Sequence, residues 1–125
     1  MVKRKTNSMK KQTRGTYFET GAYRDGSKDK LDYEGFLSPL VLEGYAYYLH
    51  KHRLQSNGEY RDSDNWQLGI DIKTYRKSLI RHTFQAWGTW RGHKVYDDKG
   101  DLVTLMDSLY GIMFNVQGYI FELLK

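Results

Sequence analysis

Side chains suited to phosphate chemistry occur in three places along the chain. The first is a short acidic segment in which Asp62 and Asp64 stand two residues apart and precede Asn65 and Trp66. Carboxylate oxygens are ligands that hard cations such as Mg²⁺ prefer, and an indole ring can stack on a nucleobase. The same residues are also typical of a turn, with aspartates bonded to nearby backbone amides and a tryptophan that fills the core. The pattern leaves both interpretations open.

The second place is the dipeptide Arg81-His82, which lies within a predicted helix. An arginine binds phosphate oxygens through several N–H donors at once. A histidine can serve as a general base, a metal ligand or a phosphate donor near neutral pH. A single helical histidine also occurs as a structural residue whose hydrogen bonds are satisfied, so His82 has two interpretations as well.

The third place is a stripe of small and polar residues at spacings of four, four, three and four, formed by Asp107, Gly111, Asn115, Gly118 and Glu122. Residues at these spacings share one face of a helix. Each glycine inside a helix costs about 1 kcal/mol relative to alanine, so either another helix or a ligand is expected to approach closely. In the second case Asp107 and Asn115 would face the ligand, and Arg81 would pair with Asp107 or with a phosphate.

Hydrophobic spacing predicts the helices that position these residues. Ser38-Pro39 is a favourable helix start, and apolar residues continue at helical spacing to about residue 53. Asp71 is expected to cap a second helix that runs to residue 90 or 91 and ends at Gly92. Asp101 is expected to cap a third helix that runs to about residue 124.

Residues 15–37 and 54–70 lack steady periodicity and contain many turn-forming residues, so they are predicted to be loops, the first with short extended pieces. The sequence therefore predicts an all-α protein, a small helical bundle of three main helices with a long N-terminal loop segment. The third helix is apolar around most of its surface, so we expect a homo-oligomer.

Composition and charge exclude several classes of protein. The chain has 125 residues and no cysteine, so it has no disulfide and no thiolate metal site. The net charge is +5, but six of the 20 basic residues lie in residues 1–14, where there is no acidic residue. Residues 15–125 contain the remaining 14 basic residues and all 15 acidic residues, so the net charge of this part of the chain is −1. A folded nucleic-acid-binding face is therefore not expected.

The same arithmetic suggests a division of the chain into a basic tail over residues 1–14, disordered or arm-like, and a single helical domain over residues 15–125. No apolar run approaches the roughly 20 residues that span a bilayer, and mean hydropathy is −0.75. We expect a cytoplasmic protein with no membrane partner.

Several segments together resemble one known family. They are TGAYRD at residues 20–25, KLDYEGFLSPL at 30–40, HKHR at 50–53, RDSDNWQLG at 61–69, Arg81-His82 and FNVQGY at 114–119. They resemble the N-terminal domain of dATP/dGTP diphosphohydrolases, a small family found in phages and prophages. The resemblance covers about residues 19–125.

The resemblance implies a helical domain that binds a purine deoxynucleotide and hydrolyses dATP or dGTP to the monophosphate and pyrophosphate, with Mg²⁺ as cofactor. A phage-encoded protein of this kind would act in the host cytoplasm. It further implies catalytic roles for His82 and Asp107, metal binding by Asp62 and Asp64, and substrate binding by Arg24, Asn65, Trp66, Arg81 and Asn115.

A second interpretation is a protein that binds a nucleotide, or a nucleotide-derived signal, without hydrolysing it, as in phage counter-defence. Helical pyrophosphohydrolases of the MazG type carry paired ExxE and ExxD carboxylates on facing helices. Here the predicted helices contain few carboxylates, namely Glu43, Asp107 and Glu122, and the ExxD at residues 59–62 falls in a loop. Both interpretations are kept.

Overall fold

The computed structural model describes residues 15–26 and 29–125, so the predicted tail over residues 1–14 lies outside the described residues. The chain divides into two compact units, with the change from one to the other between Pro39 and Leu40. Each unit is described by itself.

The described part of the N-terminal unit contains a hairpin and one short helix. Strand β1 (Thr16–Tyr17) pairs antiparallel with β2 (Tyr23–Arg24), with Thr16 opposite Arg24 and Tyr17 opposite Tyr23. The two tyrosine rings lie 4.7 Å apart, as expected for a cross-strand pair. The predicted short extended pieces are thus present. Helix α1 (Tyr33–Phe36) was not predicted, and it begins where the Asp32 side chain accepts a hydrogen bond from the amide of Gly35.

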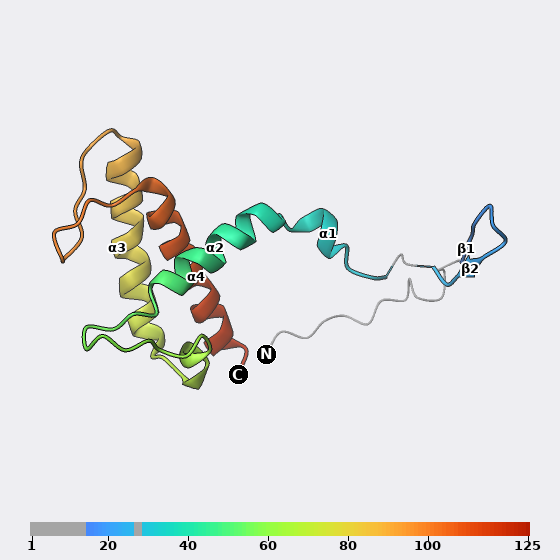
Figure 1. Ribbon diagram of the computed structural model, residues 1–125, viewed down its shortest axis with the longest axis horizontal. Coiled ribbons are helices and arrows are strands. Elements are labelled where there is room, and N and C mark those ends of the chain that lie inside the picture. Colours follow the sequence, from blue (N-terminus) through green and yellow to red (C-terminus); the bar gives the residue numbers. More distant parts are fainter. Residues whose placement is uncertain (1–14, 27–28) are drawn as a thin grey trace. The chain divides into compact units, whose positions relative to one another are not determined.

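The helical unit, Leu40–Lys125, confirms the prediction of three main helices (Figure 1). They are α2 (Pro39–Lys51), which begins at the end of the N-terminal unit, α3 (Ile72–Trp90) and α4 (Leu105–Leu123). The loop between α2 and α3 contains the short 3-10 helix η2 (Asn65–Leu68). Two predicted boundaries are confirmed: Asp71 caps α3, and Gly92 follows it with a φ of +89°, a conformation that favours glycine.

The predicted cap of the last helix is wrong. Thr104, not Asp101, caps α4, and its hydroxyl accepts a hydrogen bond of 3.1 Å from the amide of Asp107. Asp101 belongs instead to a tight turn, in which the Asp97 carboxylate accepts hydrogen bonds from the amides of Lys99 and Asp101. The residues that follow Asp101 are extended, because Leu102 forms an antiparallel bridge with Tyr96 and the amide of Val103 donates a hydrogen bond of 2.8 Å to the carbonyl of Val95, so the helix begins only after Thr104.

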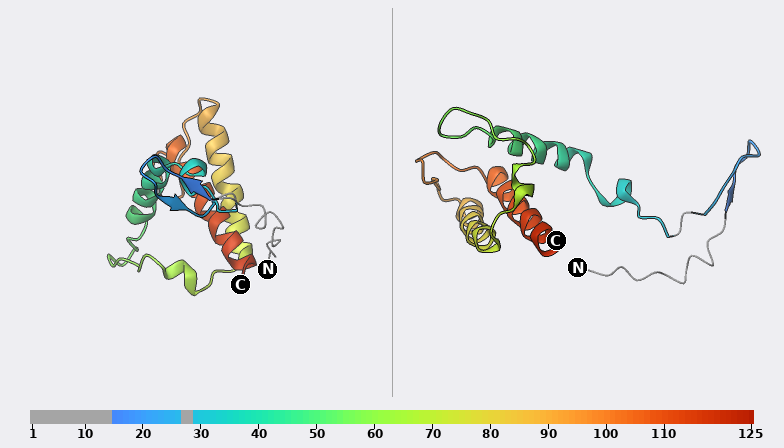
Figure 2. Two further views of the ribbon diagram at one scale, coloured as in Figure 1. Left: turned by 90° about the vertical axis from the view of Figure 1, so that its right-hand side faces the viewer. Right: turned by 90° about the horizontal axis from the view of Figure 1, so that it is seen from below.

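Helices α3 and α4 run antiparallel and lie side by side in Figures 1 and 2. The two glycines of α4 lie where side chains of α3 approach. A Cβ atom at Gly111 would lie 2.7 Å from Nδ1 of His82, and one at Gly118 would overlap the ring of Tyr75. Both contacts are too short for a real side chain, so the glycine stripe serves the close approach of another helix.

Helix α2 contacts α4 on a neighbouring face. The Tyr45 hydroxyl donates a hydrogen bond of 3.1 Å to the side-chain oxygen of Gln117, and the Tyr110 hydroxyl donates one of 3.3 Å to the carbonyl of Val41. The core between the helices is small and contains the buried side chains of Tyr45, Tyr75 and Ala86. Among the described residues, no helix has the length and apolar character needed to cross a membrane.

The packing at Gly118 yields a test of stability. Replacement of Gly118 by alanine should lower the free energy of unfolding by about 1–3 kcal/mol, because the new methyl group would overlap the ring of the buried Tyr75 side chain and displace it from its packing on α4. Gly44→Ala is the matched control, since its new methyl group would meet the hydroxyl end of the half-buried Tyr110 side chain, which can shift. Urea unfolding would measure both, and a Gly118→Ala protein as stable as wild type would contradict the packing.

Candidate functional site

Three adjoining cavities open beside α3 in the helical unit. The loop cavity, of about 430 Å³, lies between the end of α2, the α2–α3 loop and α3. The helix-pair cavity, of about 360 Å³, lies between α3 and α4. The turn cavity, of about 370 Å³, is bordered by the Asp97–Asp101 turn. Tyr48 and Arg81 line all three, so the cavities meet at these two side chains.

The loop cavity is rich in arginine. Arg53, Arg61 and Arg81 line it together with a single carboxylate, Asp62. The helix-pair cavity adds Lys77 and has no acidic lining residue. Within the described ranges, 15–26 and 29–125, none of these four cations forms a salt bridge. The two cavities therefore form a region of positive potential that favours an anion.

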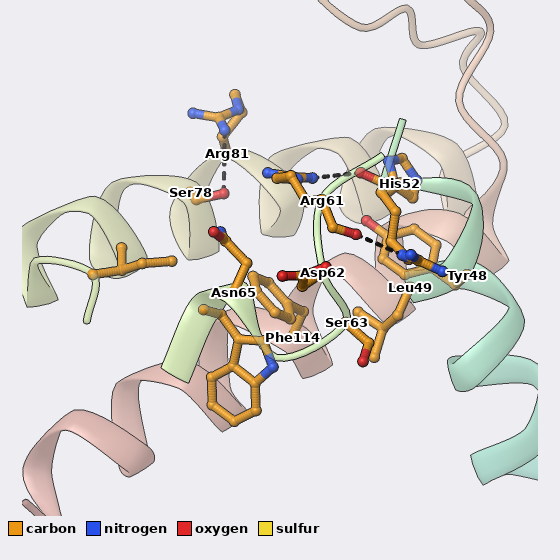
Figure 3. A pocket seen from close by; sticks show the side chains of 13 residues that line it. Tyr48, Leu49, His52, Arg61, Asp62, Ser63, Asn65, Ser78, Arg81 and Phe114 are labelled. Carbon is orange, nitrogen blue, oxygen red and sulfur yellow. Dashed lines mark hydrogen bonds between the residues drawn. The ribbon is translucent and has the colours of Figure 1, made fainter. Parts of the chain in front are cut away.

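The local structure holds the arginines in place. Arg53 Nε donates a hydrogen bond of 2.7 Å to the carbonyl of Arg61, and Arg61 donates to the carbonyl of His52. The α2–α3 loop is thus tied to the end of α2 by two arginine–backbone bonds, the second of which is drawn in Figure 3. Arg81 donates one hydrogen bond of 3.1 Å to the Ser78 hydroxyl, which leaves most of its donors for a ligand.

Aromatic rings form the apolar part of the loop cavity, which Trp66, Phe114 and Tyr48 line. Trp66 also packs edge-on against Phe121, at 4.8 Å between ring centroids, so it belongs to the hydrophobic packing and to the cavity wall at once. Asn65, Asp62 and Phe114 line the same cavity and are labelled in Figure 3. Flat apolar surface beside cationic donors is suited to a ligand with a planar ring and an anionic group.

His82 lies where the helix-pair and turn cavities meet. Burial lowers the pKa of His82 below its ordinary value of 6.5, and the nearby charge of Arg81 lowers it further, while a hydrogen bond with Gln85 acts in the opposite direction. The imidazole is therefore neutral at pH 7. Its Nδ1 lies 3.1 Å from Oε1 of Gln85. In the tautomer that donates this bond, Nε2 has a free lone pair and can accept a proton.

Asp107 lines the turn cavity and pairs with Lys51, at 2.9 Å between Nζ and the carboxylate. Asp107, which the sequence offered as one partner for Arg81, is thus paired with Lys51 instead. Asn115 is buried and lines the helix-pair cavity, and its Nδ2 donates a hydrogen bond of 2.7 Å to the carbonyl of Gly111 on the same helix. Its side-chain oxygen stays available to a ligand.

The structure brings together six of the nine residues singled out from the sequence within the two cavities beside Arg81: Asp62, Asn65, Trp66, Arg81, His82 and Asn115. Asp107 joins Arg81 and His82 in the turn cavity. Asp64 lines none of the three cavities and precedes η2 without a side-chain capping bond. Arg24 lies on β2 in the N-terminal unit.

The donor set does not form a cage for Mg²⁺. Within the described part of the chain, no three His, Cys, Asp or Glu side chains lie close enough together to hold a metal ion. Magnesium that arrives with nucleotide phosphates needs only one or two protein carboxylates, and Asp62 is the carboxylate on the loop cavity. Of the two metal ligands predicted from the sequence, Asp62 lines the loop cavity and Asp64 lines none of the three cavities.

Among the residues that line the loop cavity but were not predicted as site residues are Tyr48, His52, Arg53 and Arg61. Basic residues at the end of α2 are not by themselves a sign of a site, because the helix dipole favours cations at a C-terminus without any ligand. The signal in the sequence is the turn at Asn57-Gly58 between Arg53 and Arg61. This turn reverses the chain, so that Arg61 lies beside Arg53 near the end of α2.

The lowered histidine pKa values predict how stability depends on pH. His82 and His52 both have a pKa below 6.5, chiefly because of burial. The unfolded chain therefore binds more protons than the folded protein near pH 6, and stability falls as the pH falls through the lowered pKa values. The melting temperature should drop from pH 7 to pH 5, and the drop should be smaller in His82→Gln. An equal drop in wild type and variant would contradict the assignment to His82.

The sequence matches no family model, no curated protein and no solved structure. The function is therefore inferred from the cavities and from the chemistry of the residues that line them.

Proposed function

We propose that the helical unit binds a phosphorylated nucleoside in the loop and helix-pair cavities. The observation that carries this proposal is the set of three arginines, Arg53, Arg61 and Arg81, on one cavity that contains a single carboxylate. Guanidinium groups bind phosphate oxygens through paired hydrogen bonds. Lys77 extends the positive region along α3, which suits a ligand with more than one phosphate.

The nucleoside part fits the aromatic wall. Trp66, Phe114 and Tyr48 offer flat or edge-on apolar surface beside the arginines, and Asn65 and Asn115 offer amide groups for a base or a sugar hydroxyl. Volumes of about 430 and 360 Å³ lie within the range of about 300–1,000 Å³ typical of small-molecule sites. The choice of a purine and of deoxyribose rests on the resemblance described above.

Hydrolysis of dATP or dGTP to the monophosphate and pyrophosphate is the second candidate. It is favoured by His82, whose neutral imidazole lines the cavity that contains Asp107. In this reaction a water oxygen forms a bond to the α-phosphorus, the bond to the bridging oxygen breaks, and pyrophosphate leaves. His82 would take the water proton, and Arg81 would stabilise charge on the phosphate oxygens. Mg²⁺, bound through the substrate phosphates and Asp62, would neutralise further charge.

Binding is tested with dATP and dGTP by titration calorimetry. Arg81→Gln should weaken binding by roughly 10- to 100-fold, because a charged hydrogen bond contributes about 1.5–3 kcal/mol. Arg76→Gln is the matched control, since Arg76 is exposed on the same helix and lines none of the three cavities. Equal weakening in both variants, or no binding by wild type, would contradict the proposed site.

Hydrolysis is tested by incubation of the wild-type protein with each deoxynucleoside triphosphate and Mg²⁺, followed by chromatography of the products. If the protein is a diphosphohydrolase, monophosphate and pyrophosphate appear in equal amounts, and turnover is abolished in His82→Gln and Asp62→Asn but retained in Asp64→Asn. Recovery of the intact triphosphate from a protein that binds it would instead identify a non-catalytic binding protein, and would rule out the second candidate.

A further inference from the structure

Helix α4 carries a continuous apolar stripe on the side that faces neither α2 nor α3. Six residues form it, at alternating spacings of three and four: Met106, Leu109, Met113, Val116, Ile120 and Leu123. Helix α3 covers a different face, which contains the buried residues Ser108, Gly111, Asn115 and Gly118. Helix α2 covers a third face, where it contacts Tyr110 and Gln117.

The stripe is well exposed in the single chain. Five of its six residues are exposed, from 39% for Val116 to 60% for Met106, and Met113 is half-buried. Apolar residues that alternate at three and four along a helix are the pattern of a seam that packs against another helix, because side chains at this spacing interlock with those of a partner. The occupant of this face is thus expected to be a helix.

Charge identifies the kind of helix. The two charged residues of α4 are Asp107 and Glu122, and both lie off the stripe and pair within the chain, with Lys51 and Lys125. The positions that flank the stripe are Leu105, Tyr110, Ile112, Gln117, Tyr119 and Leu124, all uncharged. An uncharged apolar seam meets no like-charge repulsion from a second copy of itself, and it offers nothing to attract a charged partner helix.

We propose that α4 pairs with α4 of a second copy of this chain along the stripe, so that the protein is a homodimer. If the exposed surface of the stripe is fully covered in both copies, about 1,000 Å² is buried in total, which lies just below the roughly 1,200–2,000 Å² of standard specific interfaces. Other residues at the rim would add to this area. The pairing does not depend on the proposed nucleotide, because no residue of the stripe lines one of the three cavities.

Sedimentation equilibrium across the micromolar range tests the dimer. Wild type should be dimeric, and Ile120→Glu should be monomeric because the seam would then bury an unpaired charge. Phe84→Glu is the matched control, since Phe84 is exposed to 63% on the outer face of α3 and should leave the dimer intact. A monomeric wild type, or a dimer that survives Ile120→Glu, would overturn the pairing, as would dissociation by Phe84→Glu alone.

Cross-linking provides a second readout that does not require a destabilising change. The chain has no cysteine, so Val116→Cys carries a single thiol, near the midpoint of the stripe. A short bismaleimide should link two copies of this variant through α4 in either relative direction of the helices. Phe84→Cys should give no linked dimer under the same conditions. Equal yields from the two variants, or no linked dimer from Val116→Cys, would contradict the proposed interface.

Discussion

The close approach of α3 to α4 is the interaction on which the rest of the helical unit depends. Tyr75 packs against Gly118, and His82 packs against Gly111. A side chain larger than that of glycine would overlap its neighbour at either position. This contact costs helix propensity at two positions, and the packing of a buried tyrosine offsets that cost. It also sets where His82 and Arg81 emerge from α3, and therefore where the cavities lie.

The three helices, their approximate ends and the all-α class could be predicted because apolar spacing, Pro39, Asp71 and Gly92 act locally. The start of α4 could not be predicted, because Asp101 and Thr104 are both suitable capping residues. Asp101 lies in the turn held by the Asp97 carboxylate, and Thr104 caps the helix. In the same way, the glycine stripe predicted a close neighbour, but only packing could decide between a helix and a ligand. It is a helix, and Asn115 lies beside it at the edge of a cavity.

The candidate site shows a similar limit. The sequence alone could suggest Arg81, His82 and Trp66 as candidates, because their side chains are of types that bind phosphate, transfer a proton or stack on a base. It could not suggest Arg53 and Arg61, since each is unremarkable until the α2–α3 loop folds back and Arg53 binds the carbonyl of Arg61. Lys51 likewise takes Asp107 as its partner across 56 positions of sequence. The folded α2–α3 loop brings Arg53 and Arg61 together, and both line one cavity with Arg81 of α3, an arrangement that no short motif in the sequence specifies.

The central claim is that Arg81 and its neighbours bind the phosphates of a nucleotide, and a crystal structure of the protein with dATP tests it most directly. The account predicts phosphate oxygens within hydrogen-bond distance of the Arg81 guanidinium, and the base beside Trp66 or Phe114. A nucleotide bound elsewhere on the helical unit, with Arg81 still bonded to Ser78 alone, would contradict it.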